Sequence, residues 1–355
     1  MSKKPKSKKT KILLTILFVL INVGVIAITA FSEFGNPKDV STENVEFNFW
    51  YLLPALFLFV LAIFFEVFRY VLMMRKTSDV YKGKGSFRKA WKFARNTVLI
   101  GRYYDNITPA AIGGQPFQIY YMNKNAGLKG GLATTIPIMG MISGQIGFII
   151  IAVLCFLFAS ASTKDVALMA AACFGLLFYA FWPILVLIAT FLPKSTSELI
   201  VLFVRLFVKL HIIKDKDKAI ARADRGVSEY SRCVKMILKT RGLFLRTILV
   251  SILFHVLFCS IPFFVLTAFG GHIEFLPCFV TTVAVTSAIY FVPTPGNAGA
   301  AEGTFFVVFS ALSSGSVFWA MLTWRFFSYY SYIIMGGITY LLMYVDKKRA
   351  LPKKA

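Results

Sequence analysis

Long apolar runs separated by short charged segments form the main pattern of this chain. A helix needs about 20 consecutive, mostly apolar residues to cross roughly 30 Å of hydrocarbon. Six runs reach that length, and we expect each to form one membrane span: residues 12–31, 50–73, 132–158, 166–192, 247–269 and 317–344. The sequence therefore predicts an all-α, polytopic integral membrane helical bundle.

Two further stretches are apolar but interrupted by proline and glycine. One is residues 102–118, and the other is residues 291–303 inside the apolar segment 275–313. Proline removes a backbone donor and glycine loosens the chain, so an ordinary helix does not continue through either break. Irregular backbone at membrane depth is tolerated only where it is buried in protein or lines a cavity. We predict two opposed re-entrant hairpins, the first opening to the cytoplasm and the second to the outside.

The positive charge lies in the gaps between the spans. All but four of the 39 Lys and Arg residues fall in segments assigned to the cytoplasm; Lys38 and Lys164 fall in external loops, and Arg69 and Arg325 in spans. This bias predicts that both termini are cytoplasmic. The net charge of +23 then indicates contact with an anionic inner leaflet. We expect no nucleic-acid binding, because no soluble domain is left to perform it.

The predicted organisation is one membrane domain with basic ends and one basic insertion. We predict a basic cytoplasmic N-terminus over residues 1–11, a membrane domain over residues 12–345 and a basic cytoplasmic tail over residues 346–355. The basic cytoplasmic insertion is residues 193–246, within the membrane domain. Two helices are predicted within the insertion, over residues 199–213 and 219–238. Residues 87–104 alternate apolar and basic positions with a helical period, which predicts an amphipathic helix along or partly within the inner leaflet.

The two broken stretches resemble each other. Thr108–Gly113 and Thr294–Gly299 share the pattern Thr-Pro-x-x-x-Gly, and each continues with a polar residue, Gln115 or Glu302, and then a phenylalanine. Opposed hairpins of this kind are typical of inverted repeats in which half-helix ends face a substrate at the bilayer midplane. The alternative is that they are kinks whose freed backbone groups are satisfied by neighbouring helices.

Polar residues at the two breaks suit a phospholipid head group. Half-helix N-termini bind phosphate, and Arg102 and Arg325 could pair with the same phosphate. Asp105 and Glu302 would bind a head-group amine or balance the arginines; the alternative is that all four form structural ion pairs between helices. The predicted substrate-binding residues are Arg102, Asp105, Thr108, Gly113, Gly114, Gln115, Thr294, Pro295, Gly296, Asn297, Glu302 and Arg325.

Other polar residues inside the spans are few. Glu66 and Arg69 share one face of the second span. They form either an internal salt bridge, with Arg69 snorkelling to the membrane edge, or a charge pair that faces a polar cavity. His255 lies mid-span, where it forms either a polar link between helices or part of a proton or substrate pathway. The five cysteines form no CxxC pair or Cys/His cluster. We expect no disulfide, metal, other cofactor or catalytic residue.

The segments Ile107–Pro109, Gly113–Pro116 and Pro293–Gly303 together resemble the lysylphosphatidylglycerol synthase transmembrane region family. That family is the flippase-like membrane domain of the multiple peptide resistance factor proteins, and the resemblance covers almost the whole chain. It implies a domain that moves lipids across the bilayer, contributing to resistance to cationic antimicrobial peptides. In full-length relatives a soluble domain transfers lysine from aminoacyl-tRNA to phosphatidylglycerol, and we expect this chain to lack that domain.

The main functional hypothesis is a lipid translocase of the bacterial cytoplasmic membrane. Its predicted partner is a membrane phospholipid with an anionic or aminoacylated head group. No nucleotide-binding loop is recognisable, so transport would be passive or coupled to an ion or proton gradient, with Asp105 and Glu302 as candidates for the coupling. The alternatives are a phosphatidylglycerol lysyltransferase, as the family name implies, and a transporter of a polyprenyl-linked glycan precursor. Homo-oligomer formation stays open.

Overall fold

The computed structural model is built from helices. It describes residues 20, 23–24, 46–83, 85–111, 113–128, 131–158, 166–192, 194–198, 201–202, 216–240, 242–313 and 316–349. Within these ranges the regular structure is helical and contains no β-strand, which confirms the predicted all-α class.

Five helical segments of the described chain are long and apolar enough to cross a membrane. They begin with α2 (Leu52–Thr77), α5 (Gly131–Phe158), α6 (Val166–Phe191), α9 (Leu243–Ala268) and α12 (Val317–Arg325). A short 3₁₀ turn, η2 (Phe49–Tyr51), precedes α2. These segments confirm the last five predicted spans. The first predicted span, residues 12–31, lies almost entirely outside the described residues.

The last span changes its helical geometry partway along. After α12, residues Phe326–Tyr330 form a π-helical turn, η6, and α13 (Ser331–Arg349) continues the rod. Single π turns inside α-helices are rare and are frequent at functional sites. This turn begins directly after Arg325, the charged residue of the span.

The first broken stretch is a hairpin of α3 (Ser86–Ile107), the 3₁₀ turn η4 (Pro109–Ala111) and α4 (Gly114–Lys124). The sequence separates an amphipathic helix over residues 87–104 from a hairpin starting at residue 102. The structure corrects this, because one continuous helix, α3, contains the amphipathic stretch and also forms the first arm of the hairpin. The helix ends where Pro109 forces the preceding Thr108 into extended backbone, with φ −111° and ψ 142°. A further 3₁₀ turn, η3 (Asp79–Tyr81), joins α2 to this hairpin.

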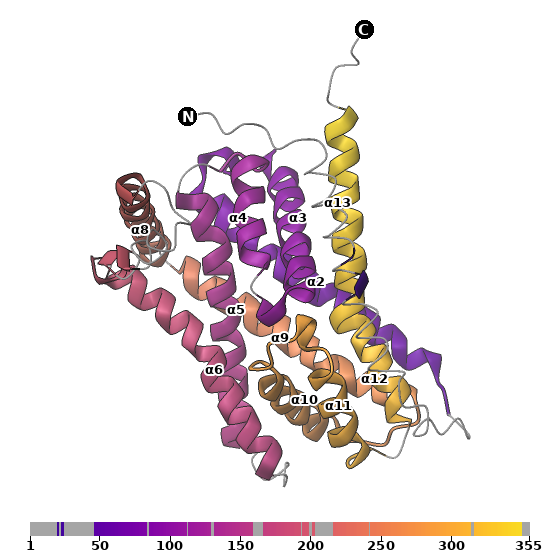
Figure 1. Cartoon of the computed structure of the whole chain (residues 1–355). Coiled ribbons are helices and arrows are strands. Elements are labelled where there is room, and N and C mark those ends of the chain that lie inside the picture. The colour runs from indigo at the N-terminus through magenta and orange to yellow at the C-terminus, as the bar shows by residue number, and fades with distance from the viewer. Residues whose placement is uncertain are drawn as a thin grey trace.

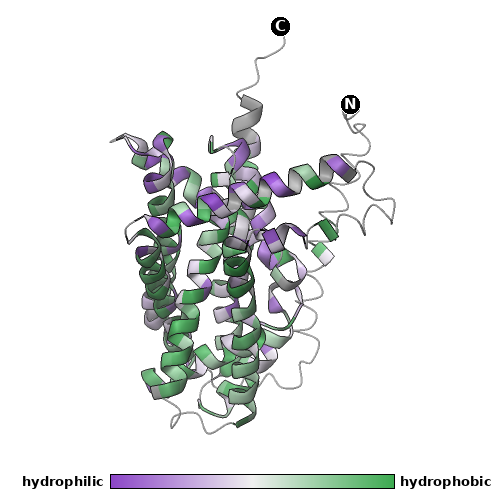
Figure 2. Ribbon diagram, turned by 90° about the vertical axis from the view of Figure 1, so that its left-hand side faces the viewer, coloured by the Kyte–Doolittle hydropathy of each residue, from purple (hydrophilic) through white to green (hydrophobic). Residues whose placement is uncertain are grey.

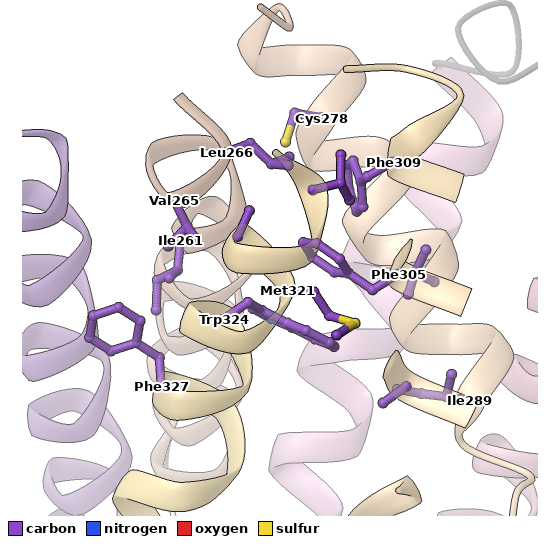
Figure 3. Packing of buried hydrophobic residues seen from close by; sticks show 14 of the residues in the cluster. Ile261, Val265, Leu266, Cys278, Ile289, Phe305, Phe309, Met321, Trp324 and Phe327 are labelled. Carbon is purple, nitrogen blue, oxygen red and sulfur yellow. The ribbon is translucent and has the colours of Figure 1, made fainter. Parts of the chain in front are cut away.

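The second hairpin contains α10 (Phe275–Ile289), the 3₁₀ turn η5 (Pro295–Asn297) and α11 (Ala300–Ser310). Its apolar side chains interlock with those of α9 and α12 (Figure 3). The rings of Phe305 and Trp324 stack at 4.6 Å between centroids, which fixes α11 against the last span. Aromatic contacts of this kind add to the packing that holds helices together in a membrane.

The two hairpins occupy opposite ends of the bundle. In Figure 1, α3 and α4 lie in the upper part, whereas α10 and α11 lie in the lower part. Hydrophilic residues gather at the upper end and hydrophobic residues dominate the lower part (Figure 2). The helix α8 (Lys216–Lys239) packs on α5 and α6 near the upper end and confirms the predicted helix over residues 219–238. The other predicted helix of the insertion, over residues 199–213, lies outside the described residues apart from 201 and 202.

Candidate functional site

The turns of the two hairpins pack against each other, and α3 also contacts η5. Both turns begin with the Thr-Pro of the shared motif, and the third residue of each turn has left-handed backbone: φ is 51° at Ala111 and 56° at Asn297. A non-glycine residue with positive φ is uncommon and costs backbone energy, so it persists only where the surrounding structure holds it. The repeated motif therefore gives both turns a strained third residue, and in the second turn the preceding Gly296 is left-handed as well.

At the first turn, the side chains of Asp105 in α3 and of Thr108, which follows α3, hold the start of α4. The backbone N–H of Gly113 donates to Thr108 Oγ1 at 2.9 Å, and that of Gly114 donates to Asp105 Oδ1 at 2.9 Å. A Cβ atom on Gly114 would lie 2.2 Å from Asp105 Oδ1, so only glycine allows this approach. A carboxylate thus occupies the N-terminus of α4, where the helix dipole favours negative charge.

At the second turn, the corresponding carboxylate comes from α11 itself. The N–H of Gly299 donates to Glu302 Oε2 at 2.5 Å, in a capping arrangement at the helix start. Asn297 Nδ2 donates to the carbonyls of Ile289 and Val292 at 2.7 and 3.2 Å, which satisfies the end of α10. Thr294 Oγ1 donates to the Ala298 carbonyl at 2.9 Å and closes the turn.

Arg325 connects this second turn to the last span. Its Nε atom forms an ion pair with Glu302 Oε1, and both side chains are buried. Its Nη1 and Nη2 atoms also donate to the Gly296 carbonyl at 3.4 and 3.3 Å. The guanidinium lies 4.7 Å from the centre of the Tyr329 ring in η6. A buried cation, a helix end and the π turn therefore meet at one place.

Beside the first turn lies a group of polar and charged side chains that we call the first charge cluster: Glu66, Arg69, Arg102 and Ser251. Arg102 pairs with Glu66 of α2, with Nη2 at 2.6 Å and Nε at 2.8 Å from Oε1. The Arg102 guanidinium lies 5.4 Å from the ring centres of both Phe254 and Tyr332, so it is held between α9 and α13. This pair joins the first hairpin to three spans.

Arg69 does not snorkel, which corrects the sequence-based interpretation. Its side chain is only 6% exposed, and its Nη1 donates to Ser251 Oγ of α9 at 2.8 Å. The predicted bridge between Arg69 and Glu66 is only a marginal contact at 4.0 Å, because Arg102 is the nearer partner. Close by, His255 Nε2 lies 3.1 Å from the Gly144 carbonyl and links α9 to α5.

Comparison with known proteins assigns the chain to a family. Residues 12–336 match the family described as the lysylphosphatidylglycerol synthase TM region. The chain belongs to this family. It is also 24% identical over 306 residues to a UPF0104 membrane protein of Methanothermobacter thermautotrophicus, covering 82% of this chain and 84% of that protein. No solved structure matches it. Membership and the apolar helices together make it a multi-pass membrane protein.

In this family member, ten of the twelve predicted site residues lie in the contacts described above. The other two have simpler positions: Pro295 starts η5, and Gln115 is half-buried in the first turn of α4. Gln115 is therefore not the counterpart of Glu302, because Asp105 binds the start of α4. The structure also gives the two arginines different carboxylate partners, Glu66 and Glu302.

The predicted set omits three polar residues of the first cluster: Glu66, Arg69 and Ser251. Charged residues inside a span are a general signal of function, and Glu66 and Arg69 carry that signal in the sequence. Their partners in α3 and α9 are distant in sequence, so no local pattern identifies them. Gln118 is also buried, 3.4 Å from the Tyr70 hydroxyl. Within the described residues, no three His, Cys, Asp or Glu side chains group as a metal site would require.

Proposed function

We propose that this protein translocates a phospholipid with an anionic or aminoacylated head group through the junction of η4 and η5. One observation carries the proposal: two helix breaks from opposite ends of the bundle meet, each with a carboxylate on a backbone N–H and a paired arginine nearby. Discontinuous helices whose ends face one another inside the membrane are typical of transporter substrate sites.

The two carboxylates act as internal substitutes for the phosphate of the substrate. Asp105 and Glu302 accept hydrogen bonds at the starts of α4 and α11, which are positions that favour any anion. A lipid phosphate would displace Glu302 and pair with Arg325 through charge-assisted hydrogen bonds. In the absence of substrate, the carboxylate keeps the buried arginine paired and avoids the cost of an isolated charge.

The first charge cluster contains buried hydrogen-bonding atoms that its own residues do not satisfy. Arg69 and Arg102 share one carboxylate, Glu66, and the atoms Arg69 Nε and Glu66 Oε2 are buried with no hydrogen-bond partner in the described structure. Most buried polar atoms have a partner in the protein, in water or in a ligand. An additional donor for Glu66 and an acceptor for Arg69 would complete this cluster, as the amine and phosphate of a head group can.

The opposed arrangement also suggests how access alternates. If the arms of one hairpin separate from the bundle, the junction opens to that end while the other hairpin still closes the opposite end. The Arg325–Glu302 pair at the second turn and the Arg102–Glu66 pair beside the first turn would then break and form in sequence as the head group passes. Protonation of Asp105 or Glu302 would weaken its hold on the helix end, which makes these two residues the candidates for coupling to a proton gradient.

The proposal is tested with vesicles that contain the purified protein and a fluorescent phosphatidylglycerol analogue. A membrane-impermeant quencher reports how fast the analogue moves between leaflets. We expect Arg325→Ala and Glu302→Gln to abolish the protein-dependent movement, whereas Lys239→Gln on exposed α8 leaves it unchanged. Full activity in the Arg325 and Glu302 variants, at wild-type protein content per vesicle, would contradict the proposal.

Two further measurements separate this function from the alternatives. Mass spectrometry of co-purified lipids identifies the head group, and enrichment of a polyprenyl-linked glycan precursor would favour that substrate class. Incubation of the protein with phosphatidylglycerol and lysyl-tRNA tests for transferase activity. Formation of lysyl-phosphatidylglycerol by the purified chain would replace the translocase proposal with the transferase alternative.

A further inference from the structure

A hollow on the outer face of the bundle, between α2 and α3, combines an aromatic floor with a basic rim. It has a volume of about 440 Å³ and is lined by Phe64, Phe87, Arg88, Trp91, Lys92 and Arg95. This volume lies within the range of roughly 300 to 1,000 Å³ that is usual for small-molecule sites. We call it the α2–α3 groove. It is separate from the turns of the two hairpins, because none of its lining residues belongs to η4 or η5.

The floor of the groove is a continuous line of aromatic rings. Phe64 of α2 lies 5.1 Å from Trp91 of α3, and Trp91 stacks on Phe87 at 6.1 Å. On α2 the line continues from Phe64 to Phe68, stacked at 5.9 Å. Such a surface is apolar and runs along the outside of a helix that crosses the membrane, so it suits an acyl chain.

The rim carries positive charge in a regular row. Arg88, Lys92 and Arg95 follow one another at helical spacings of four and three residues, so they lie on the same face of α3, and all three are exposed. Arg75 approaches from α2, with its guanidinium 5.7 Å from the centre of the Phe87 ring. The Arg75 Nε atom is buried and has no hydrogen-bond partner within the described chain. This donor therefore lies next to the three exposed basic side chains of the rim.

We propose that the α2–α3 groove binds one diacyl phospholipid with an anionic phosphate head group, separately from the translocation site. The rim holds the phosphate, the nearby aromatic rings sit at the level of the interface, and one acyl chain follows Phe64 and Phe68. Charge complementarity favours this occupant over an apolar segment of protein, which would cover the basic rim without supplying a negative charge. Binding here does not require that the protein translocate lipid.

Trp91 provides a direct probe of the groove. The protein is reconstituted into phosphatidylcholine bilayers with increasing fractions of phosphatidylglycerol or phosphatidylcholine that carries brominated acyl chains. The Trp91 signal is the difference between wild type and Trp91→Phe. We expect brominated phosphatidylglycerol to quench this signal at a fraction at least about ten-fold lower than brominated phosphatidylcholine, since each basic side chain near the head group contributes roughly five-fold.

A charge-matched pair of variants shows whether the groove or the total charge is responsible. The triple variant Arg88→Gln/Lys92→Gln/Arg95→Gln should lose the preference for phosphatidylglycerol. The control Arg232→Gln/Lys235→Gln/Lys239→Gln removes the same charge from a basic hollow on α8 that has no aromatic lining, and it should keep the preference. Equal loss in both variants would overturn the proposal and leave only a general electrostatic effect.

Other occupants of the groove give different results. If residues 12–31 of this chain or a second copy cover it, neither brominated lipid quenches Trp91, and the proposal is wrong. If the groove is an unselective lipid contact, both lipids quench equally, which also overturns it. Failure of the translocase proposal has its own signature: in that case Arg325→Ala moves lipid as wild type does, whatever the quenching result.

Discussion

Glu302 and Arg325 form a buried ion pair, and we expect a measurable coupling energy between them when the unfolding free energies of single and double variants are compared. The Glu302 side chain is 7% exposed and that of Arg325 is 4% exposed. Changing Glu302 to Gln removes the negative charge but keeps an oxygen that accepts from the Gly299 N–H. The substitution therefore tests the charge, separately from the helix cap, whose loss would cost a further 0.5–2 kcal/mol or so.

The expected loss of unfolding free energy depends on which charge each variant leaves buried and unpaired. Glu302→Gln leaves Arg325 buried and unpaired, and breaking a buried pair in this way costs about 3–5 kcal/mol. Arg325→Met leaves the carboxylate unpaired, with a cost of similar size. The double variant leaves no isolated charge, and replacing both partners by neutral groups is often close to neutral. We expect the double variant to lie within about 2 kcal/mol of wild type.

The assay is reversible unfolding in mixed micelles, followed by circular dichroism as the denaturing detergent is increased. Asp79→Asn serves as the control, because Asp79 pairs with Lys82 at 2.6 Å in an exposed position. Exposed pairs contribute little to stability, so this variant should unfold as wild type does. A double variant destabilised by the sum of the two single changes would refute the coupling. The pair would then be an incidental contact, and the role given to Arg325 at the turn would lose its structural basis.

Four further predictions use the same unfolding assay. Glu66→Gln should destabilise the protein by about 3–5 kcal/mol, because Arg102 is left without its carboxylate; no change would mean that Arg102 finds another partner. Gly296→Ala should cost about 2–5 kcal/mol, since φ is 59° there and the added carbon meets a tyrosine ring of η6 at 2.1 Å. Gly175→Ala should cost at least about 1–3 kcal/mol, because the added carbon would lie 2.0 Å from a backbone carbonyl oxygen of α10 and would push α6 away. Gly303→Ala has open space around the added carbon and should stabilise α11 by roughly 0.5–1 kcal/mol.

The two hairpins reach the same local result by different chemistry. Each second arm starts with a backbone N–H bound to a carboxylate, but Asp105 reaches it from the first arm, whereas Glu302 lies in the first turn of the second arm. The repeated Thr-Pro motif explains why the turns are alike, since proline starts each 3₁₀ turn and the threonine hydroxyl forms a hydrogen bond within the turn. The position of the carboxylate does not follow from that motif.

The sequence by itself determined the helices and the places where they break. Spans follow from runs of about 20 apolar residues, because every backbone group in lipid must be paired within its own helix. The break at Pro109 follows from the restriction that proline places on the preceding residue, and Pro293 and Pro295 prevent an ordinary helix from continuing through the second break. These are local properties. The described spans and the second hairpin agree with them to within a few residues, whereas the first hairpin extends from Ser86 to Lys124, well beyond the predicted residues 102–118.

Only the tertiary structure decided which charges meet. Arg102 pairs with Glu66 rather than Asp105, Arg69 turns inward to Ser251, and Arg325 reaches the turn at Gly296. Each of these contacts joins different elements, and the tilt and rotation of a membrane helix are set by packing against its neighbours rather than by its own sequence. The sequence could name charged residues as candidates, but their partners depend on how the helices pack.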